Sequence, residues 1–352
     1  MAMANWMIYG ANGYTGKLIA QEAKARGMTP ILGGRSPEIA KLAGELGLES
    51  RQFALGSGQE IAKNLAGVSL VLHCAGPFSS TSRPMLDGCI AARAHYLDIT
   101  GEVAVFESIF DRDAEIKRAG IVAMPGVGFD VVPTDCMARL LKDELPSATS
   151  LKMAFKGGAA VSAGTAKSMI EGMRVGAIIR RSGKLVALPL GAKTLQIPFK
   201  KSRPEPAILI AWGDVSTAFR TTGIPDIEIY TGGTPGQARG MRVMGVLTRP
   251  NLIQGLMKSL AGKLVKGPGQ EARSSGRVYV WGEARDAAGK SVSRRLILPE
   301  GYHFTIQSSL LIAKRLLAGT ALTGALTPAG AFGAGLVREV PGVELETVEP
   351  QN

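Results

Sequence analysis

Cysteine, histidine and aromatic residues are scarce in this chain of 352 residues. It holds only three cysteines and three histidines, and aromatic residues make up 5% of it. An odd, sparse set of cysteines argues against a disulfide framework and is typical of a reducing compartment, so we expect a cytoplasmic protein. The few histidines and cysteines do not have the spacing of a metal site, so no metal is expected.

Long uninterrupted apolar stretches are also lacking. Hydrophobic residues make up 45% of the chain, which is enough for a sizeable core. A helix that crosses a membrane needs roughly 20 apolar residues in a row. The most apolar region, residues 321–337, is interrupted by Gly324, Pro328 and further glycines. We therefore expect a protein that does not span a membrane, and its length suits two domains.

Three catalytic motifs are missing as well. The sequence contains no Tyr-x-x-x-Lys pair, no Gly-x-Ser-x-Gly turn and no full Gly-x-x-x-x-Gly-Lys-Ser/Thr motif. The first absence argues against the short-chain dehydrogenases. The other two absences leave no signature of an α/β-hydrolase nucleophile or of a P-loop.

Acidic residues are outnumbered by basic ones, and the formal net charge is +12. Such a charge attracts anionic substrates, acidic partners and acidic membranes. No nucleic-acid-binding motif accompanies it, so no nucleic-acid partner is expected. We interpret the charge as general surface charge together with arginines that face phosphates.

What is present begins with a strand, a glycine turn and a helix, in that order. An apolar run at 5–9 precedes the turn, and apolar residues at helical spacing follow it. Gly10 permits the tight turn, Gly13 lets a pyrophosphate approach the backbone, and Gly16 lets the helix pack closely on the strand. The candidate cofactor-binding residues here are Gly10, Asn12, Gly13, Tyr14, Thr15 and Gly16.

The end of the second predicted strand indicates which cofactor is bound. Arg35 stands where NAD enzymes usually carry an acidic residue for the ribose 2′-hydroxyl. A guanidinium instead suits a 2′-phosphate, and the hydroxyl of Ser36 can add a contact. NADP(H) is therefore the predicted cofactor. The alternatives are a solvated Arg35 and a Ser36 that caps the next helix.

Strands and helices alternate over the first 125 residues, which predicts a doubly wound parallel sheet of the Rossmann type. Its further strands are expected at 30–33, 51–55, 69–74, 95–99 and 121–124, with a helix at 103–119. Beyond Pro133 the pattern favours an α+β domain with a mostly antiparallel sheet, including a hairpin at 277–298.

We expect the Rossmann domain over 1–130, the substrate or dimerisation domain over 131–300, and C-terminal helices over 301–340 that return to the first domain. Helices are predicted at 162–181, 251–264 and 302–317, and the tail after Val340 is expected to be loosely held.

Loops at the carboxyl ends of the strands hold further candidate cofactor-binding residues. Gly76 would let the nicotinamide ribose approach the backbone, although a plain turn is the alternative. Thr100 has the alternative of capping the next helix. The candidates are Ala54, Ala75, Gly76, Pro77, Phe78, Thr100, Gly101 and Gly128.

Proton transfer would need an acid near the same edge. Asp98 ends a strand, Asp130 lies between the two predicted domains, and Tyr302 begins the returning helix. Burial raises the pKa of a carboxyl group toward neutrality, so that the group can hold and transfer a proton near neutral pH. These three are the candidate catalytic residues, and bracing the interdomain helix is the alternative for Asp130.

Several runs together resemble the saccharopine-dehydrogenase-like reductases, including their trans-acting enoyl reductase branch. The runs are Gly10–Gly16, Cys74–Phe78, His95–Glu102, Gly126–Asp135, Gly301-Tyr302 and Gly324–Ala329. The resemblance implies an NADP-binding Rossmann domain, a second α+β domain and often a homodimer. It also implies that the Thr100–Glu102 loop lies beside the nicotinamide.

We therefore expect an NADPH-dependent oxidoreductase that passes a hydride to a C=C bond of an enoyl, lipid-like substrate or to a C=N bond. The alternatives are an imine reductase of the amino-acid or opine type and a non-catalytic NADPH-binding sensor or partner protein. Leucines and lysines at 251–264 allow a peripheral membrane contact, with packing on its own domain as the alternative.

Overall fold

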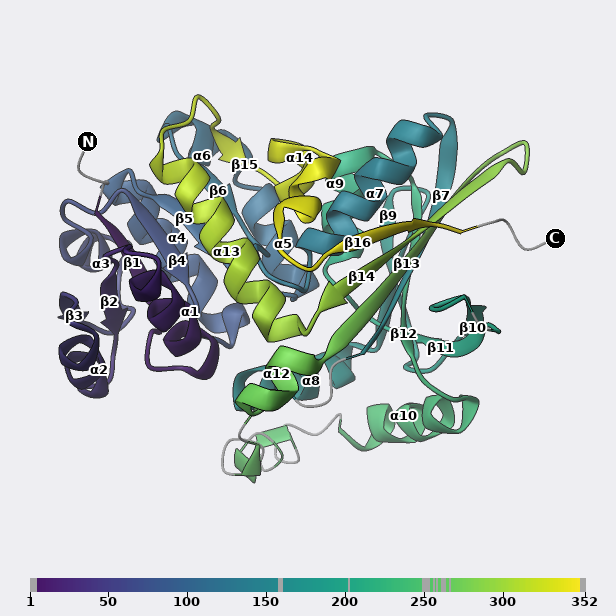
Figure 1. The fold of residues 1–352 in the computed structure, drawn as a ribbon, viewed down its shortest axis with the longest axis horizontal. Helices are drawn as coiled ribbons and strands as arrows, with labels where there is room; N and C mark the ends of the chain where they lie inside the picture. The colour runs from purple at the N-terminus through teal and green to yellow at the C-terminus, as the bar shows by residue number, and fades with distance from the viewer. Residues whose placement is uncertain are drawn as a thin grey trace.

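The chain folds around two β-sheets that lie side by side in an elongated molecule (Figure 1). The computed structural model describes residues 5–157, 161–201, 203–248 and 267–348, and residues 254, 255, 257, 259, 260, 264 and 265 between them. Most of the predicted helix at 251–264 lies outside these residues. No helix among the described residues is long and apolar enough to cross a membrane.

The first sheet has seven parallel strands in the order β15-β6-β5-β4-β1-β2-β3. The order reverses between β1 and β4, which is where the carboxyl ends of an open parallel sheet leave a crevice for a ligand. The strands are β1 (Trp6–Tyr9), β2 (Ile31–Gly34), β3 (Ser50–Gln52), β4 (Leu70–His73), β5 (His95–Asp98), β6 (Val122–Met124) and β15 (Gly324–Ala325).

Helices cover both faces of this sheet (Figure 1). They are α1 (Tyr14–Ala25), α2 (Glu38–Leu46), α3 (Gly58–Asn64), α4 (Phe78–Ala92), α5 (Val103–Phe110) and α6 (Asp113–Arg118). The prediction of a single helix at 103–119 is wrong, since α5 ends at Phe110 and α6 begins at Asp113. There Arg112 turns to pair with Asp87 on α4, at 2.7 Å, and with Glu115, at 2.7 Å.

The second sheet has nine strands and is mostly antiparallel. Its main order is β10-β11-β12-β7-β13-β14-β16, and β8 joins β12 and β9 at the side. Only β7 and β12 run parallel. The strands are β7 (Ala148–Gly157), β8 (Ala177–Arg181), β9 (Lys184–Leu188), β10 (Thr194–Ile197), β11 (Glu205–Leu209), β12 (Asp226–Gly232), β13 (Arg277–Asp286), β14 (Ser291–Pro299) and β16 (Glu344–Thr347). The predicted combination of a Rossmann sheet with an α+β domain is confirmed.

Two predictions about this region are wrong. The helix expected at 162–181 is α8 (Ala163–Val175) followed by β8, because the backbone leaves the helix at Gly176, whose φ is +90°. A side chain at this position would also clash with the carbonyl oxygen of Leu188. The tail after Val340 is not loose. It supplies β16, which pairs with β14 and is fastened by an ion pair between Arg295 and Glu346 at 2.7 Å.

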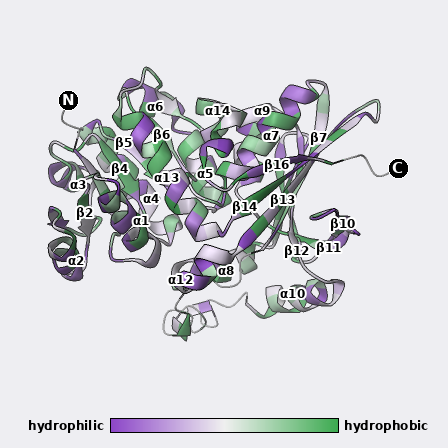
Figure 2. Ribbon diagram, viewed as in Figure 1, coloured by the Kyte–Doolittle hydropathy of each residue, from purple (hydrophilic) through white to green (hydrophobic). Residues whose placement is uncertain are grey.

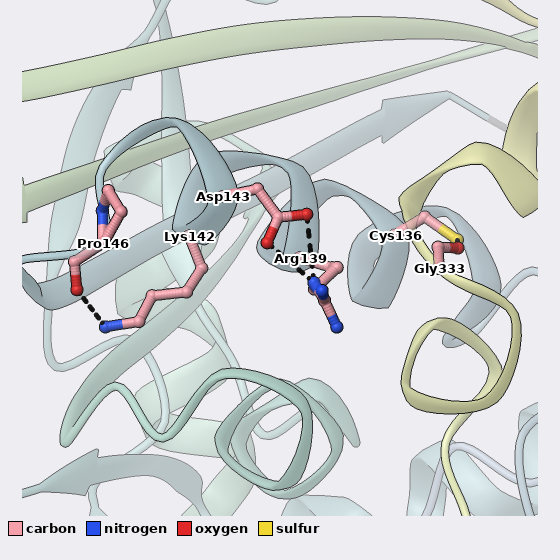
Figure 3. A network of polar contacts seen from close by, with 6 residues as sticks. All are labelled: Cys136, Arg139, Lys142, Asp143, Pro146 and Gly333. Atoms are coloured by element: carbon pink, nitrogen blue, oxygen red, sulfur yellow. Dashed lines mark hydrogen bonds and ion pairs between the residues drawn. The ribbon is translucent and has the colours of Figure 1, made fainter.

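Helix α7 (Val132–Glu144) leads from the first sheet to the second. Its inner face is buried, and the sulfur of Cys136 lies 3.9 Å from the carbonyl oxygen of Gly333. On its outer face Arg139 pairs with Asp143 one turn later at 2.9 Å, and Lys142 reaches the carbonyl oxygen of Pro146 (Figure 3). The buried inner face fixes α7, and with it the loop that precedes it, against both domains.

Helix α13 (Gly301–Leu317) returns from the second sheet and packs on α1 and β4. The hydroxyl of Ser308 donates to the carbonyl oxygen of Val127 at 2.8 Å, in the loop after β6. Hydrophobic residues, green in Figure 2, occur along the strands of both sheets, and one buried cluster joins residues of the two sheets with residues of α7 and α13. The remaining described helices are α9 (Asp214–Thr222), α10 (Pro235–Leu247), α12 (Gln270–Ser275), α14 (Pro328–Phe332) and η1 (Ala334–Glu339).

Candidate cofactor site and active site

The glycine turn after β1 forms a cradle open to a phosphate. Gly10 has a φ of +82°, and a side chain there would lie 2.8 Å from Cβ of Ala75. A side chain at Gly16 would clash with the carbonyl oxygen of Gly10. Helix α1 begins at Tyr14, and Gly13 at its N-cap provides no capping side chain. The uncapped positive end of α1 therefore suits the pyrophosphate of a dinucleotide, as the sequence predicts.

Arg35 lies exposed beyond the carboxyl end of β2, where the 2′-phosphate of NADP(H) is expected. Its guanidinium has no ion pair within the described residues, so it can meet a phosphate. The hydroxyl of Ser36 accepts the N–H of Glu38 at 3.3 Å at the start of α2. Asn12 donates to the carboxylate of Glu38 at 3.4 Å. Ser36 and Asn12 therefore also hold the glycine turn and α2 together.

In the loop after β4, the backbone is more accessible to a cofactor than the side chains are. Gly76 is exposed and Pro77 is partly exposed, whereas the ring of Phe78 is buried against His73, with centroids 5.4 Å apart. The hydroxyl of Thr81 donates to the carbonyl oxygen of Ala75 at 2.6 Å. Phe78 is a predicted cofactor-binding residue, and its side chain is turned into the core. Ala54, another candidate, lies exposed beyond β3.

Asp98 is fully buried and holds three segments in place. Its carboxylate accepts the phenol O–H of Tyr96 at 2.7 Å and the backbone N–H groups of Thr100 and Gly126 at 3.0 and 2.9 Å. Burial raises its pKa to about 6. With no exposed surface, Asp98 acts on the site by positioning the loops that follow β5 and β6.

Two predicted cofactor contacts serve in packing. Thr100 is fully buried, and its hydroxyl accepts the N–H of Glu102 at 3.1 Å. A side chain at Gly128 would lie 2.9 Å from the methyl group of Thr305 on α13. Gly101 has a different neighbour, since a side chain there would lie 2.9 Å from a carboxylate oxygen of Asp130. The absence of a side chain at Gly101 thus lets Asp130 approach the end of β5.

Asp130 is the candidate acid that the structure leaves available. It is partly buried, and no hydrogen bond or ion pair to its carboxylate is found within the described residues. Burial raises its pKa to about 7. Its backbone carbonyl accepts the indole N–H of Trp212 at 2.8 Å, which fixes the loop. A carboxyl group with this pKa exchanges protons readily at neutral pH.

An aromatic cluster of Phe129, Phe155 and Trp212 lies beside Asp130. The rings of Phe129 and Phe155 have centroids 5.8 Å apart, and those of Phe155 and Trp212 are 4.6 Å apart. All three are partly exposed, and they come from the loop after β6, from β7 and from the segment after β11. The cluster therefore makes an apolar wall to which both domains contribute. Lys156, the next residue on β7, is paired with Glu205.

Glu102 is a site residue that our sequence analysis did not select. Its carboxylate accepts the N–H groups of Phe78 and Ser79 at 3.1 and 2.8 Å, and the hydroxyl of Ser168 at 3.0 Å. Burial raises its pKa. Glu102 thus joins the N-terminus of α4 to α8 of the second domain. Its place in the Thr100-Gly101-Glu102 loop was the only signal in the sequence.

Tyr302 lies near the glycine turn, and no hydrogen bond between it and Asp130 is found within the described residues. Its phenol oxygen accepts the N–H of Ser162 at 2.6 Å and is hydrogen-bonded to the hydroxyl of Thr165 at 3.0 Å, at the start of α8. Its ring meets that of Tyr14 edge-on, with centroids 5.0 Å apart. The structure therefore separates the three predicted acids: Asp98 in the core, Asp130 at the aromatic cluster and Tyr302 at the domain junction.

Comparisons with known proteins agree with this arrangement. Residues 6–124 match the family described as the saccharopine dehydrogenase NADP binding domain. A Mycobacterium tuberculosis protein that bears the name of a trans-acting enoyl reductase is 31% identical over 182 residues, which cover 47% of this chain and 43% of that protein. A saccharopine dehydrogenase-like oxidoreductase of Bos taurus is 26% identical over 153 residues, 37% of this chain and 35% of the relative.

The solved structure of saccharopine dehydrogenase (L-Glu forming) from Saccharomyces cerevisiae has the same fold. It superposes with a TM-score of 0.65 at 13% identity and covers 98% of this chain and 100% of that one. The resemblance to saccharopine-dehydrogenase-like proteins is confirmed, and so is NADP as the cofactor of the first domain. The matched segments span less than half of each curated relative.

Proposed function

We propose that this chain, whose residues 6–124 form an NADP-binding domain of the saccharopine dehydrogenase type, is an NADPH-dependent reductase of apolar enoyl substrates. The observation that supports this most is the pairing of Asp130 with the aromatic cluster. An ionisable carboxyl group that has no hydrogen bond or ion pair among the described residues lies beside an apolar wall, in the loop that follows β6 at the carboxyl edge of the first sheet. That edge is where a Rossmann domain presents its nicotinamide.

NADPH, when bound, supplies the hydride that adds to one carbon of the double bond. The chain's own residues have the remaining tasks. Asp130, in its protonated form, donates the proton to the other carbon, because its pKa near 7 keeps much of the group protonated at neutral pH. Asp98 and Glu102 hold the loops after β5 and β4, and the aromatic cluster packs on the apolar chain and excludes water.

An enoyl substrate fits this wall better than a polar imine. Phe129, Phe155 and Trp212 offer apolar area, and the neighbouring cation Lys156 is already paired with Glu205. A dicarboxylic amino-acid imine would need cations for its carboxylates. The trans-acting enoyl reductase name of the mycobacterial relative points the same way.

The experiment is to follow NADPH oxidation with two substrate panels. One panel holds 2-enoyl thioesters of increasing chain length, and the other holds cyclic imines and mixtures of 2-oxo acids with amines. We expect oxidation with the enoyl panel, rising with chain length. Turnover of the imine panel alone would contradict the enoyl proposal and indicate an imine reductase. Tight NADPH binding without turnover of either panel would contradict an enzymatic role.

A further inference from the structure

The segment at 267–273, from the second domain, lies on the glycine turn of the first. The phenol of Tyr14, the first residue of α1, donates to the carbonyl oxygen of Pro268 at 2.5 Å. Gly267 has a φ of +79°, and a side chain there would lie 2.7 Å from the ring of Tyr14. Only glycine lets the segment lie this close to Tyr14.

Arg273, at the end of this segment, reaches the same tyrosine. Its Nη1 donates to the phenol oxygen of Tyr14 at 2.9 Å and to the carbonyl oxygen of Pro268 at 2.7 Å. The guanidinium carbon lies 5.9 Å from the centroid of the Tyr14 ring. Both of these hydrogen bonds use one nitrogen, and within the described residues the other donors of the fork have no hydrogen-bond partner.

The guanidinium of Arg273 forms no ion pair with a carboxylate within the described residues, although Glu300 lies near enough to interact with its charge. The Glu300 carboxylate accepts the N–H groups of Tyr302 and His303 at 2.9 and 3.0 Å and caps α13. Arg273 therefore places a full positive charge beside the first residue of α1, where the helix already presents its positive end.

Two positive features side by side repel each other unless an anion joins them. The anion that an NADP-binding domain holds at the start of its first helix is the cofactor diphosphate. A guanidinium fork suits phosphate oxygens, since it can give two parallel hydrogen bonds.

We infer that Arg273 is a diphosphate-binding residue supplied by the second domain, and that Gly267, Pro268 and Tyr14 hold it in position. Residues of both domains then bind NADP(H), Arg35 at the 2′-phosphate and Arg273 at the diphosphate. The inference rests on the NADP site and not on the choice of substrate.

The test is a pair of titrations with two probes, NADPH and adenosine 2′-monophosphate, which lacks the diphosphate. The variants are Arg273→Gln, Arg35→Gln and, as a matched control, Arg277→Gln. Arg277 is exposed, and among the described residues its guanidinium donates only to the neighbouring carbonyl oxygen of Gly276, at 3.0 Å. Binding is read by NADPH fluorescence and by calorimetry, and thermal unfolding without ligand checks the fold of each variant.

We expect Arg273→Gln to weaken NADPH at least about tenfold, the scale of one lost charge-assisted contact, and to leave adenosine 2′-monophosphate unchanged. Arg35→Gln should weaken both probes, and Arg277→Gln neither. An Arg273→Gln variant that binds NADPH like the wild type would overturn the inference and show that Arg273 only pins the 267–273 segment. Equal losses for both probes would also overturn it. If the wild-type chain does not bind NADPH, the assignment of NADP(H) as the cofactor fails, and the inference fails with it.

Discussion

We assign the preference for NADPH over NADH to Arg35. It is exposed at the end of β2 and has no ion pair within the described residues, so its charge is available for the 2′-phosphate. We predict that Arg35→Asp weakens NADPH by about 1.5–3 kcal/mol, the scale of hydrogen bonds to a charged group. NADH should be little affected or should bind better. Fluorescence titration with both cofactors measures this, and equal losses for the two would refute the assignment.

In the proposed reaction, proton transfer depends on Asp130. Because burial raises its pKa to about 7, the donating form prevails below that pH and declines tenfold per pH unit above it. We predict that kcat/KM at saturating NADPH falls above about pH 7. Asp130→Asn should lower turnover roughly 10²-fold or more and remove this limb, with NADPH affinity unchanged.

The matched control for Asp130 is Asp143→Asn, on the exposed face of α7. It should leave the rate and the pH profile as they are. If Asp130→Asn folds and keeps the wild-type profile, the proton comes from another group, and Glu102 would be next to test because its pKa is also raised by burial.

At the residue scale, positions could be predicted from the sequence where the backbone geometry permits only one type of residue. Gly10 and Gly16 could be identified because no larger side chain fits there, and Arg35 because it follows the second strand. The roles of Asp98, Thr100 and Glu102 could not be assigned. Whether a carboxylate after a strand faces a cleft or a buried N–H depends on loops far away in the chain, such as the one at Gly126.

Helix α9 shows how a buried carboxyl group affects an element. Asp214, its first residue, is fully buried and accepts the hydroxyl of Thr134 at 2.7 Å, while its other oxygen has no partner within the described residues. Burial raises its pKa well above the ordinary value. The folded state therefore holds a proton that the unfolded state releases above about pH 4, so stability falls as pH rises.

We predict that Asp214→Asn stabilises the protein at pH 8 by about 1 kcal/mol or more and changes little at pH 4. The amide keeps the shape of the protonated acid and removes the cost of ionising it, up to about 1.4 kcal/mol per unit of pKa shift. Urea unfolding at the two pH values measures this. A variant that is less stable than the wild type at pH 8 would show that the ionised carboxylate is tolerated.

Strands with an apolar or alternating pattern of their own could be predicted, and two short strands without such a pattern could not. The hairpin of β13 and β14 follows from alternation around a short turn. By contrast, β15 joins β6 across some two hundred residues, and β16 completes the second sheet from a tail with little apolar content. Their short sequences have no strand signal of their own, because the partner strand supplies the stabilising hydrogen bonds.

At the scale of the whole molecule, two domains meet around one edge of the Rossmann sheet. The loop before α7 carries Asp130, α13 returns beneath the glycine turn, and Glu102 reaches Ser168 across the junction. The aromatic cluster draws residues from both domains. A substrate held against this cluster would thus lie between the domains, next to the cofactor and the acid.

The most direct test of this arrangement is to trace the hydrogen atoms. NADPH carrying deuterium at the transferred position of C4 is given to the enzyme with a 2-enoyl thioester in ordinary water, and the product is examined by mass spectrometry and NMR. We predict one deuterium on one carbon of the former double bond and one solvent-derived proton on the other, with Asp130→Asn slowing the reaction. NADPH oxidation that leaves no deuterium in the product, or no oxidation at all, would contradict an NADPH-dependent enoyl reductase.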